Sequence, residues 1–94
     1  MKYILLGKLE AQWAGKQRER VQKAQAKLKE LGMTAQSIYY TQGRFDFVDV
    51  VEAPNAEAML AFSVWYASQG LGRIQSLPAF DADTFEAAVK RAGA

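Results

Sequence analysis

The segment YYTQGRFDFVDVV, Tyr39–Val51, decides the fold of this chain. Two runs rich in aromatic and β-branched residues flank Gln42-Gly43-Arg44, and runs of this kind around a short glycine-containing turn predict a β-hairpin. We expect its strands over positions 34–41 and 45–53. Gly43 suits the turn because glycine readily adopts a positive φ. A single glycine without a following helix start does not make a phosphate-binding loop.

The rest of the chain extends this hairpin to the order β-α-β-β-α-β plus a short C-terminal helix. The other expected elements are a strand over 2–9, a helix over 12–31, a helix over 56–68, a strand over 71–80 and a helix over 81–94. This order predicts an α+β, ferredoxin-like fold: a four-stranded antiparallel sheet with both long helices on one face. The 94 residues contain no repeat or linker, so we expect one domain, 1–94.

Cap residues support the helix boundaries. Asn55 is a favourable N-cap for the second helix, and Gly32 and Gly70 are suited to ending the two long helices. In the C-terminal helix, Asp83 and Glu86 have the spacing of a capping box.

The first strand is apolar on both of its faces, with Tyr3 and Leu5 in one alternating set and Ile4 and Leu6 in the other. Two helices cover only one face of a ferredoxin-like sheet, so a strand of this kind predicts that the second face is also covered. We expect two sheets to pack face to face in a homodimer or a higher homo-oligomer. The second helix carries apolar residues outside its main stripe, which we interpret as a further subunit contact.

Composition excludes several kinds of site. The chain has no cysteine and no histidine, so it has no disulfide, no thiolate nucleophile and no histidine ligand for haem or metal. We expect no cofactor and no metal. The net charge is only +2, although half of the 12 lysines and arginines lie between positions 16 and 29. We interpret the stripe of Lys16, Arg20, Lys23 and Lys27 as a solvated helix face, with no nucleic-acid partner.

The apolar run at the N-terminus is too short for a signal peptide, and no later run approaches the ~20 apolar residues of a membrane span. We therefore expect a cytoplasmic protein with no membrane partner.

Two aspartates of the hairpin, Asp46 and Asp49, are candidates for chemistry. They are three residues apart, so on an extended strand they point to opposite faces and do not form a carboxylate pair. In a structural interpretation, one accepts backbone hydrogen bonds near the turn and the other pairs with Arg73 or faces solvent. In a functional interpretation, one carboxylate lies in a cavity between two sheets and binds or deprotonates a small ligand.

We expect such a cavity to contain Tyr40, Phe47, Asp49 and Arg73. This expectation depends on strand register, because a shift of one residue exchanges the two faces of a strand.

The run Gly43-Arg44-Phe45-Asp46 resembles the signature of the GYD domain family, with phenylalanine where the family name implies tyrosine. The segments VVEAPNAEAM (Val50–Met59) and SLPAF (Ser76–Phe80) are also similar to that family. The resemblance makes Gly43, Phe45 and Asp46 the signature positions. It implies ferredoxin-like chains that pair into a dimeric α/β barrel, and it implies no particular reaction.

Three hypotheses of function follow. The first is a homo-oligomeric module that binds an unidentified small molecule. The second, suggested by quinol monooxygenases in the wider superfamily, is a cofactor-independent monooxygenase or isomerase with an aspartate base. The third is a structural or interaction module in which assembly itself is the function.

Overall fold

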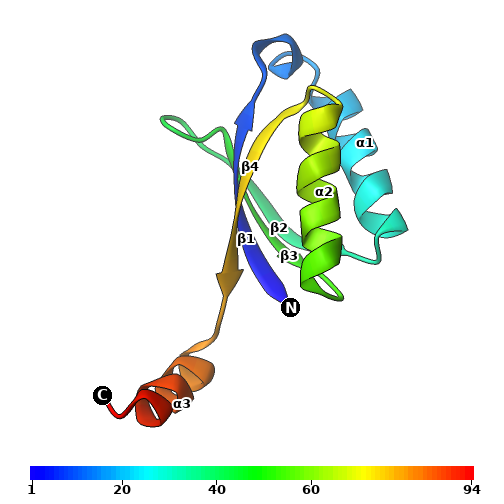
Figure 1. Cartoon of the computed structure of the whole chain (residues 1–94). Coiled ribbons are helices and arrows are strands. Elements are labelled where there is room, and N and C mark those ends of the chain that lie inside the picture. The colour runs from blue at the N-terminus through cyan, green and yellow to red at the C-terminus, as the bar shows by residue number, and fades with distance from the viewer.

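The computed structural model describes residues 1–94 and has the expected order of elements. Its elements are β1 (Lys2–Leu9), a 3-10 turn (Ala11–Trp13), α1 (Gln17–Glu30), β2 (Thr34–Tyr40), β3 (Phe47–Glu52), α2 (Ala56–Ser68), β4 (Gly72–Ala79) and α3 (Ala82–Ala92). The strands form one antiparallel sheet in the order β2-β3-β1-β4, and α1 and α2 lie on the same side of it (Figure 1). The ferredoxin-like prediction is confirmed.

Strand register decides which side chains lie beneath the helices. On β1, Tyr3 and Leu5 are buried, and they pair with Val51 and Asp49 of β3. Because successive residues of a strand point to opposite faces, Phe47, Asp49 and Val51 all lie on the helix-covered face. The core under the helices comprises Tyr3, Leu5, Leu28, Met33, Phe47, Val51, Ala53, Met59, Phe62, Tyr66 and Leu71.

The other face of the sheet has no helix over it, and we call it the open face. Its centre is apolar: Ile4 pairs with Val50 on one side and with Leu77 on the other, and Leu6 pairs with Val48. Tyr39 extends this surface from β2 and is largely exposed. The apolar second face predicted for β1 is therefore present, and no part of the chain's own helices covers it.

The first helix begins later than we predicted. The expected helix over 12–31 is divided into the 3-10 turn at Ala11–Trp13 and α1, which starts at Gln17. Gly15 lies in the interruption, and glycine costs a helix roughly 1 kcal/mol relative to alanine. The N-cap, Lys16, makes no side-chain capping bond that would extend the helix toward the N-terminus.

The caps of the other two helices differ in how well they were predicted. The Asn55 side chain accepts a hydrogen bond from the Ala58 amide at 2.8 Å, as predicted for α2. In α3 the N-cap is Asp81, which accepts from the Thr84 amide at 2.8 Å, so the capping box expected from Asp83 and Glu86 is wrong. Asp81 precedes the first helical turn, where a carboxylate reaches the free amides.

Replacing Asn55 with alanine is expected to lower the free energy of unfolding by about 1 kcal/mol, because the Ala58 amide loses its partner. Chemical denaturation measures this change. Asn55→Ser, which keeps a capping oxygen, should retain most of the stability. Equal losses for the two variants would show that the cap does not act through this bond.

Candidate ligand-binding site

The two aspartates of the hairpin have different environments. The Asp46 amide donates to the Gly7 carbonyl at 2.7 Å, and its Oδ2 accepts from the Leu9 amide at 2.7 Å. These two bonds tie the loop of the hairpin to the end of β1. Asp46 therefore acts as the turn-proximal structural acid that the sequence allowed.

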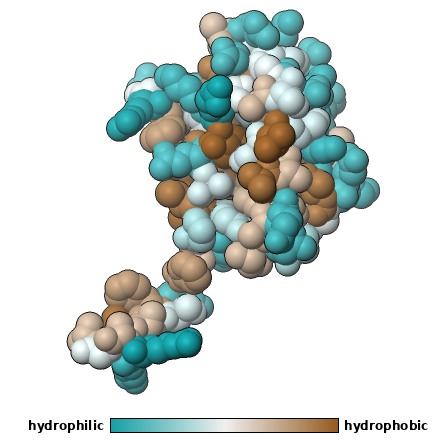
Figure 2. Space-filling view, in the orientation of Figure 1, coloured by the Kyte–Doolittle hydropathy of each residue, from teal (hydrophilic) through white to brown (hydrophobic).

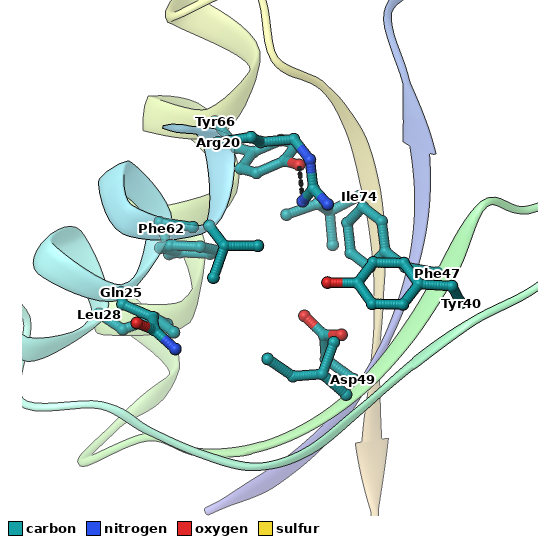
Figure 3. Close-up of a pocket in the computed structure, with 12 residues that line it drawn as sticks. Arg20, Gln25, Leu28, Tyr40, Phe47, Asp49, Phe62, Tyr66 and Ile74 are labelled. Atoms are coloured by element: carbon teal, nitrogen blue, oxygen red, sulfur yellow. Dashed lines mark hydrogen bonds between the residues drawn. The ribbon is translucent and has the colours of Figure 1, made fainter. Parts of the chain in front are cut away.

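Asp49 faces a pocket enclosed by α1, α2 and the sheet (Figure 3). We call this the helix-side pocket; its twelve lining residues are Arg20, Val21, Ala24, Gln25, Leu28, Ile38, Tyr40, Phe47, Asp49, Phe62, Tyr66 and Ile74. Its volume is about 30 Å³. A space of this size accommodates one or two water molecules. Most of the wall is apolar, and Arg20 and Asp49 are its charged members.

The floor of the pocket depends on a glycine. Phe47 pairs with Gly7 across β1 and β3, and its ring lies where a side chain on residue 7 would project. Gly7 does not have a positive φ, so the glycine is required for space and not for backbone conformation. The absent side chain thus allows the Phe47 ring to lie on the sheet and contact Tyr66 at a centroid distance of 6.1 Å.

Arg20 enters the pocket from α1 and is only 4% exposed. Its Nη1 donates to the Tyr66 hydroxyl at 3.3 Å, and its Nη2 donates to Gln17 Oε1 at 2.6 Å. The guanidinium lies 5.3 Å from the centroid of the Phe47 ring, within range of a cation–π interaction. Gln17 also donates to the Tyr40 hydroxyl. These contacts fix the guanidinium against the aromatic wall.

The burial of Arg20 corrects our prediction, which placed it on a solvated face with Lys16, Lys23 and Lys27. Its position on the helix indicates the reason. Arg20 precedes Ala24 by four residues and Leu28 by eight, so it belongs to the apolar stripe of α1. That periodicity indicates that Arg20 is buried, whereas its charge alone wrongly suggests a solvated position.

Two polar atoms in this region have no protein partner. Arg20 Nε and Asp49 Oδ1 are both buried, and neither makes a hydrogen bond. Arg20 and Asp49 also form no ion pair within 4.0 Å. Buried polar groups without partners are rare in folded proteins because they cost free energy. Both residues line the helix-side pocket, so a ligand or water atom in it has these two atoms as available partners.

Burial determines the titration of this site. Desolvation raises the pKa of Asp49 from 3.8 to about 6, and the positive charge of Arg20 partly opposes this shift. Desolvation also raises the pKa of Tyr66, against the effect of its hydrogen bond with Arg20. The protonation state of Asp49 therefore changes close to neutral pH, as that of an acid or base in a binding site often does.

The model of the GYD domain family matches residues 3–89 of the 94-residue chain. The chain belongs to the GYD domain family. A search of curated proteins gave no match.

In this GYD-domain protein the residues that resemble the family signature lie at the hairpin turn. Gly43 has a φ of 108°, which favours glycine, and the hydroxyl of Thr41 donates to the Phe45 carbonyl at 2.7 Å to close the loop. Asp46 then anchors the loop to β1, as described above. Gly43, Phe45 and Asp46 thus shape the hairpin loop, and the aspartate that faces the pocket is Asp49, three positions after Asp46.

The four residues expected in one cavity are separated by the sheet. Tyr40, Phe47 and Asp49 line the helix-side pocket together. Arg73 pairs with Lys8 on the open face and is exposed. The cavity formed by the first three residues is therefore under the helices and not on the face where a second sheet would pack. The positive charge in this cavity comes from Arg20.

The GYD-domain structure contains no group of three or more carboxylates, histidines or cysteines placed to hold a metal ion. None of its helices combines the length and the apolar character needed to cross a membrane.

The pKa of Asp49 predicts a pH-dependent stability. Between about pH 4 and pH 6, folded Asp49 keeps its proton while the unfolded chain has lost it, so the free energy of unfolding falls as the pH rises. We expect the loss attributable to Asp49 to be about 1–2 kcal/mol, because solvent screens the partly exposed carboxyl. Asp49→Asn should remove this loss in denaturation experiments across the same range. The same slope in both proteins would contradict the assignment.

Proposed function

We propose that this GYD-domain protein is a homo-oligomeric module that binds a small organic anion in the helix-side pocket. The observation that supports this proposal is the buried guanidinium of Arg20, which has a free Nε and no carboxylate within 4.0 Å. A buried cation without a close counter-ion is costly, and an anionic ligand relieves that cost.

Hydrogen-bond donors dominate the polar part of the pocket. The hydroxyl of Tyr66 accepts from Arg20 and the hydroxyl of Tyr40 accepts from Gln17, so each keeps its own proton for a ligand. With Arg20 Nε, three donors are available to the oxygens of a carboxylate. The apolar remainder of the wall suits a hydrocarbon body. These features favour a small aromatic or branched carboxylic acid.

Asp49 adjusts this preference with pH. A protonated Asp49 donates one more hydrogen bond to a carboxylate, whereas an ionised Asp49 repels it. Its pKa of about 6 places the change between pH 5 and pH 7. We expect carboxylates to bind more tightly at pH 5.5 than at pH 7.5.

A ligand larger than water must widen the pocket. The exposed lining residues are Gln25 and Tyr40, which is 53% exposed, so they mark its opening. Helix α1 buries only Arg20 and Leu28. Elements with few buried apolar contacts open most easily, so we expect α1 and the Tyr40 ring to move outward on binding.

Amide chemical shifts measured during titration with benzoate test this proposal. We expect benzoate to perturb residues of the pocket, and the neutral analogue benzamide to bind far more weakly. Arg20→Gln should abolish the benzoate effect, while Arg18→Gln, at an exposed position of the same helix, should preserve it. Equal binding of benzoate and benzamide, or binding unaffected by Arg20→Gln, would overturn the proposal.

The apolar open face supports the homo-oligomeric part of the proposal. Ile4, Leu6, Val48 and Val50 lie at its centre with no helix over them. Exposed apolar faces of this kind mark protein contacts, and two sheets packed face to face bury both. Val50→Lys should convert the oligomer to a monomer in sedimentation velocity, and Gln22→Lys on the exposed side of α1 should not. A wild-type protein that is monomeric at high concentration would exclude this assembly.

One observation favours the enzymatic alternative, in which Asp49 is a general base. Its Oδ1 is unpaired, and its pKa of about 6 suits proton abstraction near neutral pH. The minimal reaction is removal of a proton next to the carbonyl of a bound 2-oxo acid, followed by its return from solvent. Deuterium uptake into phenylpyruvate in heavy water, lost in Asp49→Asn, would support an enzyme. Binding without uptake above the buffer rate would support the binding module.

A further inference from the structure

Helix α3 is fully formed but packs against nothing in its own chain. None of its side chains is buried, and it lies apart from α1 and α2 (Figures 1 and 2). Asp81 caps its start, and Gly93 ends it in the left-handed conformation. Isolated helices of this length are marginal in water, because nucleation is costly and few bonds repay it. A stable α3 therefore requires a surface that the body of the same chain does not provide.

Helix α3 is amphipathic, with one apolar side that is suited to packing. Ala82, Phe85, Val89 and Ala92 recur at helical spacing, and Asp83, Glu86, Lys90 and Arg91 lie toward the other side. Phe85 is 65% exposed, and Phe80, in the segment that leads to α3, is 73% exposed. Two aromatic side chains at this exposure are a strong driving force for association, since each buries a large apolar area in a contact.

The start of α3 and the open face form one continuous surface. An open hollow of about 570 Å³ lies between them, lined by Ile4 and Val50 of the open face, by Phe80, which precedes α3, and by Thr84 in its first turn. A body that rests on the centre of the open face would also enter this hollow. The same body would then contact Phe80 and the first turn of α3.

We propose that α3 is an arm that packs onto a second copy of this chain, with Phe85 buried against the partner. The inference rests on the homo-oligomer proposed above. A two-fold contact uses the same surfaces on both subunits, so each α3 clasps the other subunit. The charges of α3 argue against a membrane as its partner. Two acids balance two bases on the polar side of α3, whereas membrane-surface helices are rich in lysine and arginine.

Hydrogen exchange of the full chain, measured at high and low protein concentration, tests this arm. We expect the α3 amides to be protected in the oligomer and to exchange rapidly after dilution. The monomeric variant Val50→Lys should also lose this protection. The amides of the core strands should stay protected in every sample, because their hydrogen bonds lie within one subunit.

The other outcomes separate the failure of this α3 proposal from the failure of the homo-oligomer proposal. Rapid exchange of α3 in an intact oligomer would overturn the arm and leave the assembly in place. Equal protection of α3 in the Val50→Lys monomer would overturn it too, because α3 would then pack on its own body. Protection that appears only with anionic lipid vesicles would overturn it in favour of a membrane surface. A wild-type protein that never oligomerises would overturn both proposals.

A point substitution provides a second measurement. Phe85→Ala is expected to weaken dimerisation at least about tenfold, because a buried aromatic side chain contributes more than 1.4 kcal/mol to a contact. Lys90→Ala is the matched control, since it truncates a long side chain on the polar side of the same helix. Circular dichroism should show both variants folded. Equal dimer affinities for the two variants would overturn the assignment of Phe85.

Discussion

Replacing Gly7 with alanine is expected to lower the free energy of unfolding by about 3 kcal/mol. A Cβ on residue 7 would overlap the ring of Phe47, which is buried among the core residues, so the ring must leave its position against Tyr66. Overfilled cores typically lose about 1–3 kcal/mol through displaced side chains and backbone, and a direct overlap with a ring belongs at the upper end. Chemical denaturation measures the loss.

Two controls assign this loss to the contact with Phe47. Gly15→Ala adds the same methyl group where no atom lies within 4 Å, so it should be neutral or slightly stabilising. In a Phe47→Leu background, where the ring is gone, Gly7→Ala should cost much less than in the wild type. The same cost in both backgrounds would show that the penalty arises elsewhere in β1.

Replacing Arg20 with glutamine is expected to destabilise the protein by about 1 kcal/mol, because relief of the buried charge offsets part of the lost contacts, and to raise the pKa of Asp49 above 6. The Tyr66 hydroxyl loses its donor, and the Phe47 ring loses the cation beside it. The pKa rises because the charge of Arg20 is the contribution that opposes desolvation. Denaturation and an NMR titration of the Asp49 carboxyl carbon measure the two effects.

Arg18→Gln removes the same charge from an exposed position of α1 and should change stability by less than about 0.5 kcal/mol. It should leave the titration of Asp49 unchanged. If both arginine variants shift the pKa of Asp49 equally, the shift comes from the net charge of the protein and not from the position of Arg20 beside the pocket.

The fold could be predicted because its signals are local. The glycine turn at Gly43, the N-cap Asn55 and the alternating apolar residues of β1 each act within a few residues. Those signals fix the order of the elements, and chain connectivity then restricts the topology. The start of α1 and the cap of α3 were predicted wrongly, since several neighbouring residues have similar preferences there.

The site could be predicted only in part because it depends on register and on contacts far apart in the sequence. Asp49 was recognised as an acid among apolar residues, but the face on which it lies follows from its pairing with Leu5 and Ile38. Arg73 lies on the opposite face of the sheet from Asp49. Arg20 was missed because a charged residue on a helix is usually solvated, and its aromatic partners Phe47 and Tyr66 come from other elements.

The central claim is that Arg20 and Asp49 form a site for a small organic anion beneath the helices. A crystal structure with bound 4-bromobenzoate tests it most directly, because the anomalous signal of bromine locates the ligand without ambiguity. We predict the carboxylate within hydrogen-bonding distance of Arg20 and the bromine among the apolar lining of the helix-side pocket. A bromine peak on the open face or beside α3, with the helix-side pocket unchanged, would contradict the claim.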